Sequence, residues 1–300
     1  FAASSFRLAA AFGIVSSILT IHMGDESGFL VTRDQPTKIA AMEATWDTHE
    51  APAPLTLFAI PNEAEQKNAM EISIPWVFGL MGTRSLSTEI PGIKQLEAQA
   101  EERIKNGQKA VATLEALRKD PKNEALRTEF KALQPDLGFG LLLKRYTEDV
   151  TQATPEMIKQ AAQDTTPQVA PMFWSFRLMI SCGLGMALIF VLGLVFSMKK
   201  TLQNQPLYLR LTLLALPLPW IACEAGWFVA EYGRQPWTIY NILPTHLSVS
   251  SLSTGDLIGS ILGFVVLYTL MLIAEMWLMI RFSRKGPSSL GTGRYHFEQK

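Results

Sequence analysis

The residues with clear chemical potential begin with two glutamates in an apolar stretch of membrane-spanning length, residues 211–232. Glu224 and Glu231 are seven residues apart, which is two helical turns, so they share one face of a helix. Trp227 lies between them on that face. Because a carboxylate at membrane depth is costly without a partner, this row predicts a helix that holds a charged or redox-active group.

A thioether and a guanidinium lie close together near another apolar stretch. Met179 offers a soft ligand that suits haem iron, although a lone methionine in a membrane helix is more often core packing. Arg177, two residues earlier, needs an anionic partner, and haem propionates are suitable bidentate acceptors. Glu231 could ligate a ferric haem, relay protons or pair with Arg234. The residues alone favour that ion pair.

Four apolar runs are the elements that must position these groups, in a chain that is 48% hydrophobic. Crossing a hydrocarbon core of about 30 Å takes about 20 helical residues, and the runs have about that length. The pattern predicts an all-α fold, an integral membrane helical bundle. Its four transmembrane helices are expected at residues 1–23, 169–198, 207–232 and 256–281.

A long polar segment, residues 24–168, separates the first two helices and carries 22 acidic and 16 basic residues. The other helix ends are basic, and the positive-inside rule puts them in the cytoplasm and the long loop outside. An outer loop is expected at 233–255 and a cytoplasmic tail at 282–300. The whole chain has a net charge of zero, and we expect no nucleic-acid partner. The basic residues are Arg7, Lys199, Lys200, Arg210, Arg281, Arg284, Lys285, Arg294 and Lys300, against Glu298.

Several elements are expected inside the long loop. Pro36 suits the first turn of a short helix, on which Lys38 and Glu43, five residues apart, diverge by about 140°. The remaining expectations are a break at 24–28, an extended Pro-rich stretch at 48–61, helices at 93–117 and 124–133 that form a solvated cap, and a glycine-flexed return at 137–146.

Neither cysteine can brace this loop, because Cys182 and Cys223 both fall in predicted membrane helices. The loop must therefore hold its shape by packing. The first residues, from Phe1, do not have the pattern of a signal peptide, and we expect the chain to be the carboxy-terminal portion of a longer membrane protein.

Six sequence blocks together resemble subunit I of cytochrome bd ubiquinol oxidase, in its form with a long Q-loop. The likeness runs in order through essentially all 300 residues. The blocks are GDESG at 24–28, the segment from Lys38 to Glu43, GFGLLLKRY at 138–146, FRLM at 176–179, GWFVAEYGRQPW at 226–237 and GTGRYHFEQ at 291–299.

The resemblance implies a role for each candidate residue. Met179 matches the methionine ligand of the low-spin haem b558, and Arg177 the arginine that steadies that haem. Glu231 matches the glutamate ligand of a high-spin haem, usually assigned as b595, and Trp227 an aromatic residue between haems. Arg234, in the same block, is expected to contact the cofactor. The loop residues Lys38 and Glu43 match those implicated in binding and oxidising quinol.

The resemblance also implies an activity and partners. Such an enzyme oxidises quinol at the Q-loop, on the periplasmic side of the bacterial inner membrane. Electrons pass through haems b558, b595 and d to oxygen, which becomes water, and a proton gradient forms without pumping. The expected partners are subunit II, small accessory subunits and the amino-terminal half of the same subunit. That half carries the family's histidine ligands, which His22, His49, His246 and His296 do not match.

Two other functions fit part of the pattern. A proton-coupled transporter could relay protons through Glu224 and Glu231; it would show no haem absorbance. A sensor could bind a ligand with its exported segment, but only 19 residues follow Arg281, which is too few for an output module.

Overall fold

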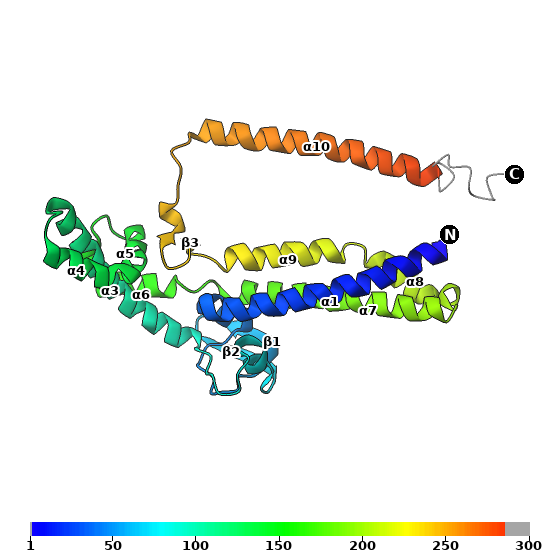
Figure 1. Cartoon of the computed structure of the whole chain (residues 1–300), viewed down its shortest axis with the longest axis horizontal. Helices are drawn as coiled ribbons and strands as arrows, with labels where there is room; N and C mark the ends of the chain where they lie inside the picture. Colours follow the sequence, from blue (N-terminus) through cyan, green and yellow to red (C-terminus); the bar gives the residue numbers. More distant parts are fainter. Residues whose placement is uncertain (1, 286–300) are drawn as a thin grey trace. The chain divides into compact units, whose positions relative to one another are not determined.

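The computed structural model describes residues 2–285 of the chain, in two compact units, residues 1–248 and 249–300. The first unit contains α1 (Ala2–Asp34), α7 (Val169–Met198), α8 (Pro206–Leu214) and α9 (Leu218–Tyr232). Helix α7 packs side by side with α1 and with α9 (Figure 1). The second unit contains α10 (Thr254–Lys285).

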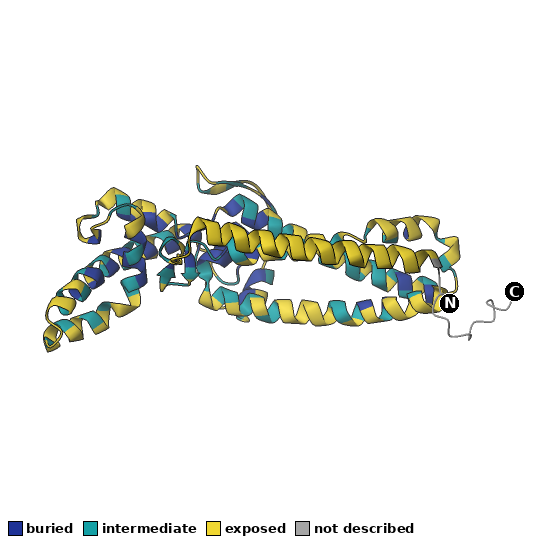
Figure 2. Cartoon of the chain, turned by 90° about the horizontal axis from the view of Figure 1, so that it is seen from above, coloured by how far each residue is buried: buried dark blue, intermediate teal, exposed yellow. Residues whose placement is uncertain are grey.

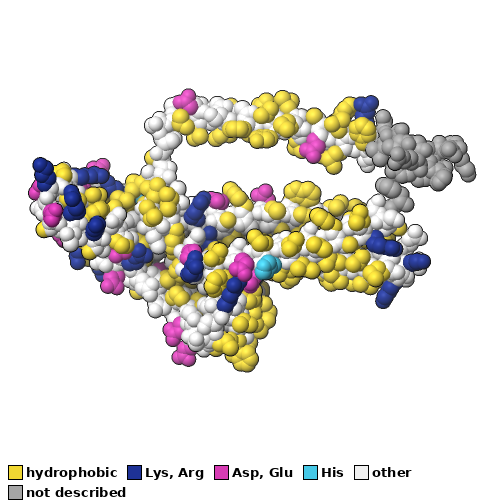
Figure 3. Space-filling model, in the orientation of Figure 1, with side chains coloured by type: hydrophobic (Ala, Val, Ile, Leu, Met, Phe, Trp, Pro, Cys, Tyr) yellow, Lys and Arg dark blue, Asp and Glu magenta, His cyan; other side chains and the backbone are white. Residues whose placement is uncertain are grey.

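Within residues 2–285, four segments are long and apolar enough to cross a membrane: α1, α7, α8 with α9, and α10. The predicted all-α membrane bundle is therefore confirmed. Hydrophobic side chains cover much of the visible surface of the membrane-length helices, while charged ones gather over the loop helices (Figure 3).

The predicted end of the first helix at residue 23 is wrong, because α1 continues to Asp34. Gly24 and Gly28 meet no neighbouring atoms that would force a bend, and a glycine costs a helix only about 1 kcal/mol. The two acidic residues of this stretch find a partner, since Arg84 contacts both Asp25 and Glu26. The helix ends where Pro36 begins the next one.

Prolines divide the third membrane segment. Helix α8 ends at Leu214 and α9 begins at Leu218, with Pro217 between them and Pro219 in the first turn of α9. A proline has no N–H to continue a helix and clashes with the preceding turn. The single helix expected at residues 207–232 is thus interrupted between α8 and α9.

The long loop folds into a mostly helical body. The helix predicted from Pro36 and the helix predicted at 124–133 are confirmed, and the one predicted at 93–117 extends two residues further. The elements are α2 (Pro36–Glu43), β1 (Leu55–Asn62), β2 (Lys67–Ile74), the π-helix η1 (Gly79–Thr83), α3 (Ile93–Lys119), α4 (Glu124–Leu133), η2 (Gln134–Asp136), α5 (Leu137–Leu142), η3 (Leu143–Arg145), η4 (Val150–Gln152) and α6 (Pro155–Gln163).

Strands β1 and β2 form an antiparallel hairpin that the sequence pattern did not predict beyond an extended stretch. Their register pairs Leu55 with Ile74 and Asn62 with Lys67. The outer loop adds β3 (Trp237–Ile239), β4 (Leu243–Pro244) and η6 (Thr245–Leu247), while η5 (Leu202–Asn204) links α7 to α8.

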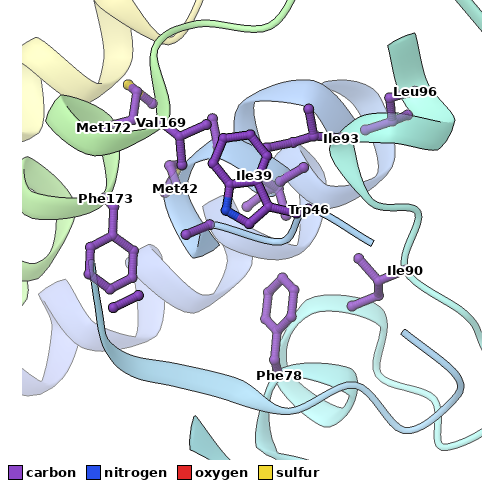
Figure 4. Close-up of a cluster of buried hydrophobic side chains, with 14 of the residues drawn as sticks. Ile39, Met42, Trp46, Phe78, Ile90, Ile93, Leu96, Val169, Met172 and Phe173 are labelled. Atoms are coloured by element: carbon purple, nitrogen blue, oxygen red, sulfur yellow. The ribbon is translucent and has the colours of Figure 1, made fainter. Parts of the chain in front are cut away.

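Two hydrophobic clusters hold the loop. In the first, Trp46 packs among side chains from α2, α3 and α7, including Ile39, Ile93 and Val169 (Figure 4). In the second, Trp237 of the outer loop packs between the loop helices, with its ring centroid 5.1 Å from that of Phe139. The first cluster fixes α2 against the membrane helices, and the second joins the outer loop to α3 and α5.

The segment expected to be a flexible glycine return is instead helical, as α5. Its glycines allow close backbone contact: Gly140 lies against Gly107 of α3, and Gly138 lies against the Asn241 carbonyl. A side chain at either position would collide with backbone, so these glycines serve packing.

The second unit consists, in its described part, of an irregular segment and α10. Every described side chain of this helix is exposed within its unit (Figure 2), and the Arg281 guanidinium lies 4.9 Å from the Trp277 ring centroid. The motif at 291–299, His296 and the tail from residue 286 lie outside the described residues.

We expect Trp237→Ala to cost about 3–5 kcal/mol, because it empties a site in which the indole is 1% exposed. Hydrogen exchange of the full-length protein should then accelerate in α5 and in residues 233–248. The control Trp76→Ala removes an indole that is 65% exposed and should change neither region. Unchanged exchange in the Trp237→Ala protein would contradict the packing described for the second cluster.

Candidate functional site

Helix α2 is a short helix buried almost throughout, at the junction of the loop with the membrane helices. Pro36 begins it, and Ala44, in the left-handed region at φ 52°, ends it by donating its N–H to carbonyls of the last turn. Its neighbours are α1, α3 and α7. Two of its side chains are charged, Lys38 and Glu43, and each extends to a different membrane helix.

Glu43 pairs with Arg177 of α7 and is only 3% exposed. The guanidinium donates to both carboxylate oxygens, from Nη2 to Oε2 at 2.6 Å and from Nη1 to Oε1 at 3.3 Å. Nη2 also donates to the Thr56 carbonyl of β1, and the guanidinium carbon lies 4.5 Å from the Phe173 ring centroid. The pair therefore joins α2, the hairpin and α7.

Burial raises the pKa of the Glu43 carboxyl above its ordinary value, because water no longer solvates the anion. The charge of Arg177 and its hydrogen bonds oppose this effect. Glu43 is thus a carboxylate that binds a proton at higher pH than an exposed glutamate.

Lys38 extends from α2 to α9, where its Nζ donates to the Ala230 carbonyl at 3.1 Å. Burial lowers the pKa of this amine, and the positive charge of Arg234 lowers it further, while Glu231 acts in the opposite direction. Lys38 and Glu43 thus diverge toward α9 and α7, as their five-residue spacing predicts.

Met179 lies where α7 meets α9. Its sulfur is so close to Gly226 that a Cβ on that glycine would lie 2.9 Å from it. The thioether therefore packs against α9 at Gly226, the residue that precedes Trp227 in the sequence. On α7, Met179 follows Arg177 by two residues.

The other face of α9 carries the predicted row. Ala225 and Val229 are buried, while Glu224 and Trp227 are exposed, the indole to 65%. Glu231 forms an ion pair with Arg234, three residues on, which is the alternative that the residues alone favoured. A face that carries two acids on a membrane-length helix must meet a polar or charged partner rather than lipid.

A family model described as "Cytochrome bd terminal oxidase subunit I" matches residues 1–287. The chain belongs to the cytochrome bd terminal oxidase subunit I family. The family suggested by the motifs is therefore confirmed. Its apolar helices and this membership make the chain part of an inner-membrane protein.

Named relatives in the cytochrome bd family come from two bacteria. "Cytochrome bd-II ubiquinol oxidase subunit 1" of Escherichia coli (strain K12) is 41% identical over 286 residues, 95% of this chain and 56% of the relative. "Cytochrome bd ubiquinol oxidase subunit 1" of Bacillus subtilis (strain 168) is 28% identical over 286 residues, which are 94% of this chain and 48% of the relative. "Putative cytochrome bd menaquinol oxidase subunit I" of the same organism is 24% identical over 286 residues, which are 93% of this chain and 48% of the relative. The chain thus spans about half the length of these relatives.

The cytochrome bd family implies haem, and two features of this site fit one. Among the residues that the structure describes, the Nε atoms of Arg177 and Arg234 are buried without a hydrogen-bond partner, so each guanidinium can still donate to an acid such as a haem propionate. The thioether of Met179 and the carboxylate of Glu231 are both able to ligate haem iron. The possible iron ligands and the unpartnered arginine N–H groups are therefore both consistent with haem binding.

Three contributors to this cytochrome bd site were missed from the sequence. They are the Thr56 carbonyl, which accepts from Arg177, and Gly226 and Gly233, which allow Met179 and Lys38 to approach α9. The two glycines are seven residues apart and so share a helical face. That spacing was a usable signal, whereas a backbone carbonyl leaves none.

We expect Arg177→Leu to cost about 3–5 kcal/mol, because it leaves the buried Glu43 carboxylate without its cation. Adding Glu43→Gln should restore part of that loss, since an amide has no charge to stabilise. Thermal unfolding of the full-length protein measures both.

The matched control for this cycle is the exposed pair Lys94 and Asp47. Lys94→Met alone, and with Asp47→Asn, should change stability by at most about 1 kcal/mol. Equal unfolding temperatures for Arg177→Leu and the Arg177→Leu, Glu43→Gln double variant would show that the buried charge is not the cause.

Proposed function

We propose that the full-length protein is the quinol-oxidising subunit of a cytochrome bd type terminal oxidase, and that this chain contributes the quinol site and ligands of two haems. The observation that carries the proposal is the position of α2. Its Glu43 holds Arg177, two residues from Met179, and its Lys38 reaches Ala230, next to Glu231. Family membership supports the same assignment.

Glu43 is the proposed proton acceptor. Oxidising a quinol to a quinone releases two protons with two electrons, so a base must stand near the ring oxygens. Burial raises the pKa of Glu43 above its ordinary value, against the opposing charge of Arg177, so this carboxylate is a better proton acceptor than an exposed glutamate. Arg177 keeps the carboxylate oriented, while Lys38 is a donor that could hold a quinone oxygen.

Five residues are proposed to contact haem. Met179 would ligate the iron of b558, and Arg177, whose Nε has no hydrogen-bond partner among the described residues, would donate to a propionate of that haem. Glu231 would ligate a high-spin haem, b595, with Arg234 beside it and Trp227 on the same face of α9. When bound, haems b558, b595 and d accept the electrons and supply the iron at which oxygen is reduced to water.

The proposed sidedness follows from the charges at the helix ends. Lys199 and Lys200 follow the end of α7 that is remote from α2, and the positive-inside rule assigns that end to the cytoplasm. The Q-loop with Glu43 is then periplasmic. Protons leave quinol on that side, whereas oxygen reduction takes them from the cytoplasm, so charge separates without a pump.

Partners are proposed for the surfaces that this chain leaves exposed. The row of Glu224, Trp227 and Glu231 needs a polar environment, and the chain spans about half of its relatives. We assign the haem-facing remainder of the pockets to the amino-terminal half of the subunit, and further membrane-helix contacts to subunit II and small accessory subunits. The transporter alternative is not retained, because the family is one of oxidases.

Reduced-minus-oxidised spectra of the full-length protein test the haem ligands. Met179→Leu should remove the b558 band, because leucine has no donor atom, and Glu231→Ala should remove a high-spin haem. Met198→Leu on the same helix and Glu129→Ala on α4 change exposed side chains and should leave both signals. If Met179→Leu and Glu231→Ala both retain the wild-type spectrum, the ligand assignments are wrong.

Turnover with quinol tests α2. Lys38→Ala or Glu43→Ala should depress quinol oxidation strongly, while oxidation of an artificial donor that bypasses the loop continues. Because burial raises the pKa of Glu43, wild-type quinol turnover should fall as the pH is lowered through that raised pKa. Glu43→Gln should be slow at every pH. An unchanged pH profile in Glu43→Gln would exclude Glu43 as the base.

A further inference from the structure

The carboxy-terminal end of α9 has an unusual set of hydrogen-bond partners. The last four carbonyls of a helix have no intrahelical N–H to accept from. Here the Val229 carbonyl accepts from the N–H of Gly233, and the Tyr232 carbonyl from the N–H of Gln235. The Glu231 carbonyl accepts at 3.5 Å from the Gln235 side chain. The Ala230 carbonyl accepts from Lys38, which belongs to a different helix and lies 192 residues earlier.

The stem of Lys38 reaches α9 by passing close to a glycine. A Cβ on Gly233 would lie 3.0 Å from Lys38 Cε and 2.5 Å from Met172 Cε, and Gly233 is buried. The lysine stem therefore passes over the one residue of this turn that has no side chain. A Cβ at this position would crowd the lysine stem, the Met172 methyl and the Val229 carbonyl, so at least one of them would have to shift.

The Lys38 ammonium also lies where the charges of the helix end favour a cation. A cation at a helix carboxy terminus is favourable, because the carbonyl ends carry partial negative charge. Lys38 interacts with the charges of Arg234 and Glu231, which form an ion pair at the same helix end. The end of α9 thus brings together two cations and one carboxylate, and one cation comes from the loop.

We propose that Lys38 is a positioning residue for Glu231: by capping α9 at Ala230 across Gly233, its ammonium fixes the end of the helix that carries this carboxylate and supplies positive charge beside it. This inference rests on the proposed function, in which Glu231 ligates a high-spin haem. It gives Lys38 a role in the electron-accepting part of the molecule, in addition to any contact with quinol.

The consequence is a direct link between the quinol segment and the haem ligand. Lys38 and Glu43 lie on one short helix, α2. Their contacts with α9 and α7 attach this helix to both membrane helices. Since a nearby cation favours the reduced form of a haem, loss of the Lys38 charge should lower the midpoint potential of the haem that Glu231 ligates.

The test is a redox titration of the high-spin haem in membranes containing the full-length oxidase. Lys38→Met keeps an unbranched apolar stem and removes the charge. It should lower the reduced-to-oxidised ratio of that haem at fixed ambient potential by about threefold or more. Lys38→Arg keeps the charge and should restore most of the ratio. The control Lys131→Met removes an exposed lysine of α4 and should have no effect.

A second variant covers the case in which Lys38→Met does not assemble. Gly233→Ala leaves every charge in the chain unchanged and adds a methyl 3.0 Å from Lys38 Cε, which crowds the lysine stem. It should therefore shift the ratio in the same direction, but by less than Lys38→Met. The matched control Gly183→Ala adds a methyl at a site with no atom within 4 Å in this chain. An unchanged ratio in Lys38→Met, or in Gly233→Ala where the first variant fails, would overturn the proposal. So would a change confined to the KM for quinol.

The inference and the proposed function can fail separately. If Glu231→Ala retains the high-spin haem, the ligand assignment fails and the positioning role fails with it. If Glu231→Ala loses that haem while Lys38→Met and Gly233→Ala leave its ratio unchanged, Glu231 remains the ligand and the role of Lys38 alone is wrong.

Discussion

Glu43 and Arg177 form a nearly buried ion pair, and removing either partner would leave the other without its counter-charge. Such a pair contributes little net stability, because the desolvation penalty offsets most of the attraction. Its effect is geometric. Two hydrogen bonds to the carboxylate and a third to the Thr56 carbonyl fix α2, the β1–β2 hairpin and α7 in one relation. A loop without disulfides thereby acquires a defined attachment to a membrane helix.

The same short helix makes a second attachment through Lys38 at the end of α9. Because α7 carries Met179 and α9 carries Glu231, α2 contacts both helices that present candidate haem ligands. The apolar packing around Trp46 supports this arrangement from the loop side. In the proposed function, charge changes on α2 during quinol oxidation would therefore occur next to the groups that receive the electrons.

The sequence predicted much of this architecture where one local rule decided the outcome. Pro36 marked the start of α2, the gap expected between residues 117 and 124 separated α3 from α4, and membrane-length apolar runs identified the spans. The five-residue spacing of Lys38 and Glu43 correctly implied that they diverge. These features depend on periodicity or on a single residue's backbone chemistry.

Other features depend on neighbours that are distant in sequence, and there the sequence failed. The glycines at 24 and 28 suggested a helix end, but α1 continues through them to Asp34. The glycines of α5 suggested flexibility, although they serve close contact with Gly107 and Asn241. The choice of Glu43 as partner for Arg177 joins residues 134 positions apart. No local pattern encodes such a pairing.

The central claim is that the carboxylate of Glu43, ionised against Arg177, takes up a proton when quinol is oxidised. Infrared difference spectroscopy of the full-length oxidase during quinol oxidation observes this carboxyl group directly. The account predicts a protonated-carboxyl band that is absent in Glu43→Gln and displaced in Arg177→Lys. A wild-type difference spectrum without such a band, or one that persists unchanged in Glu43→Gln, would contradict it.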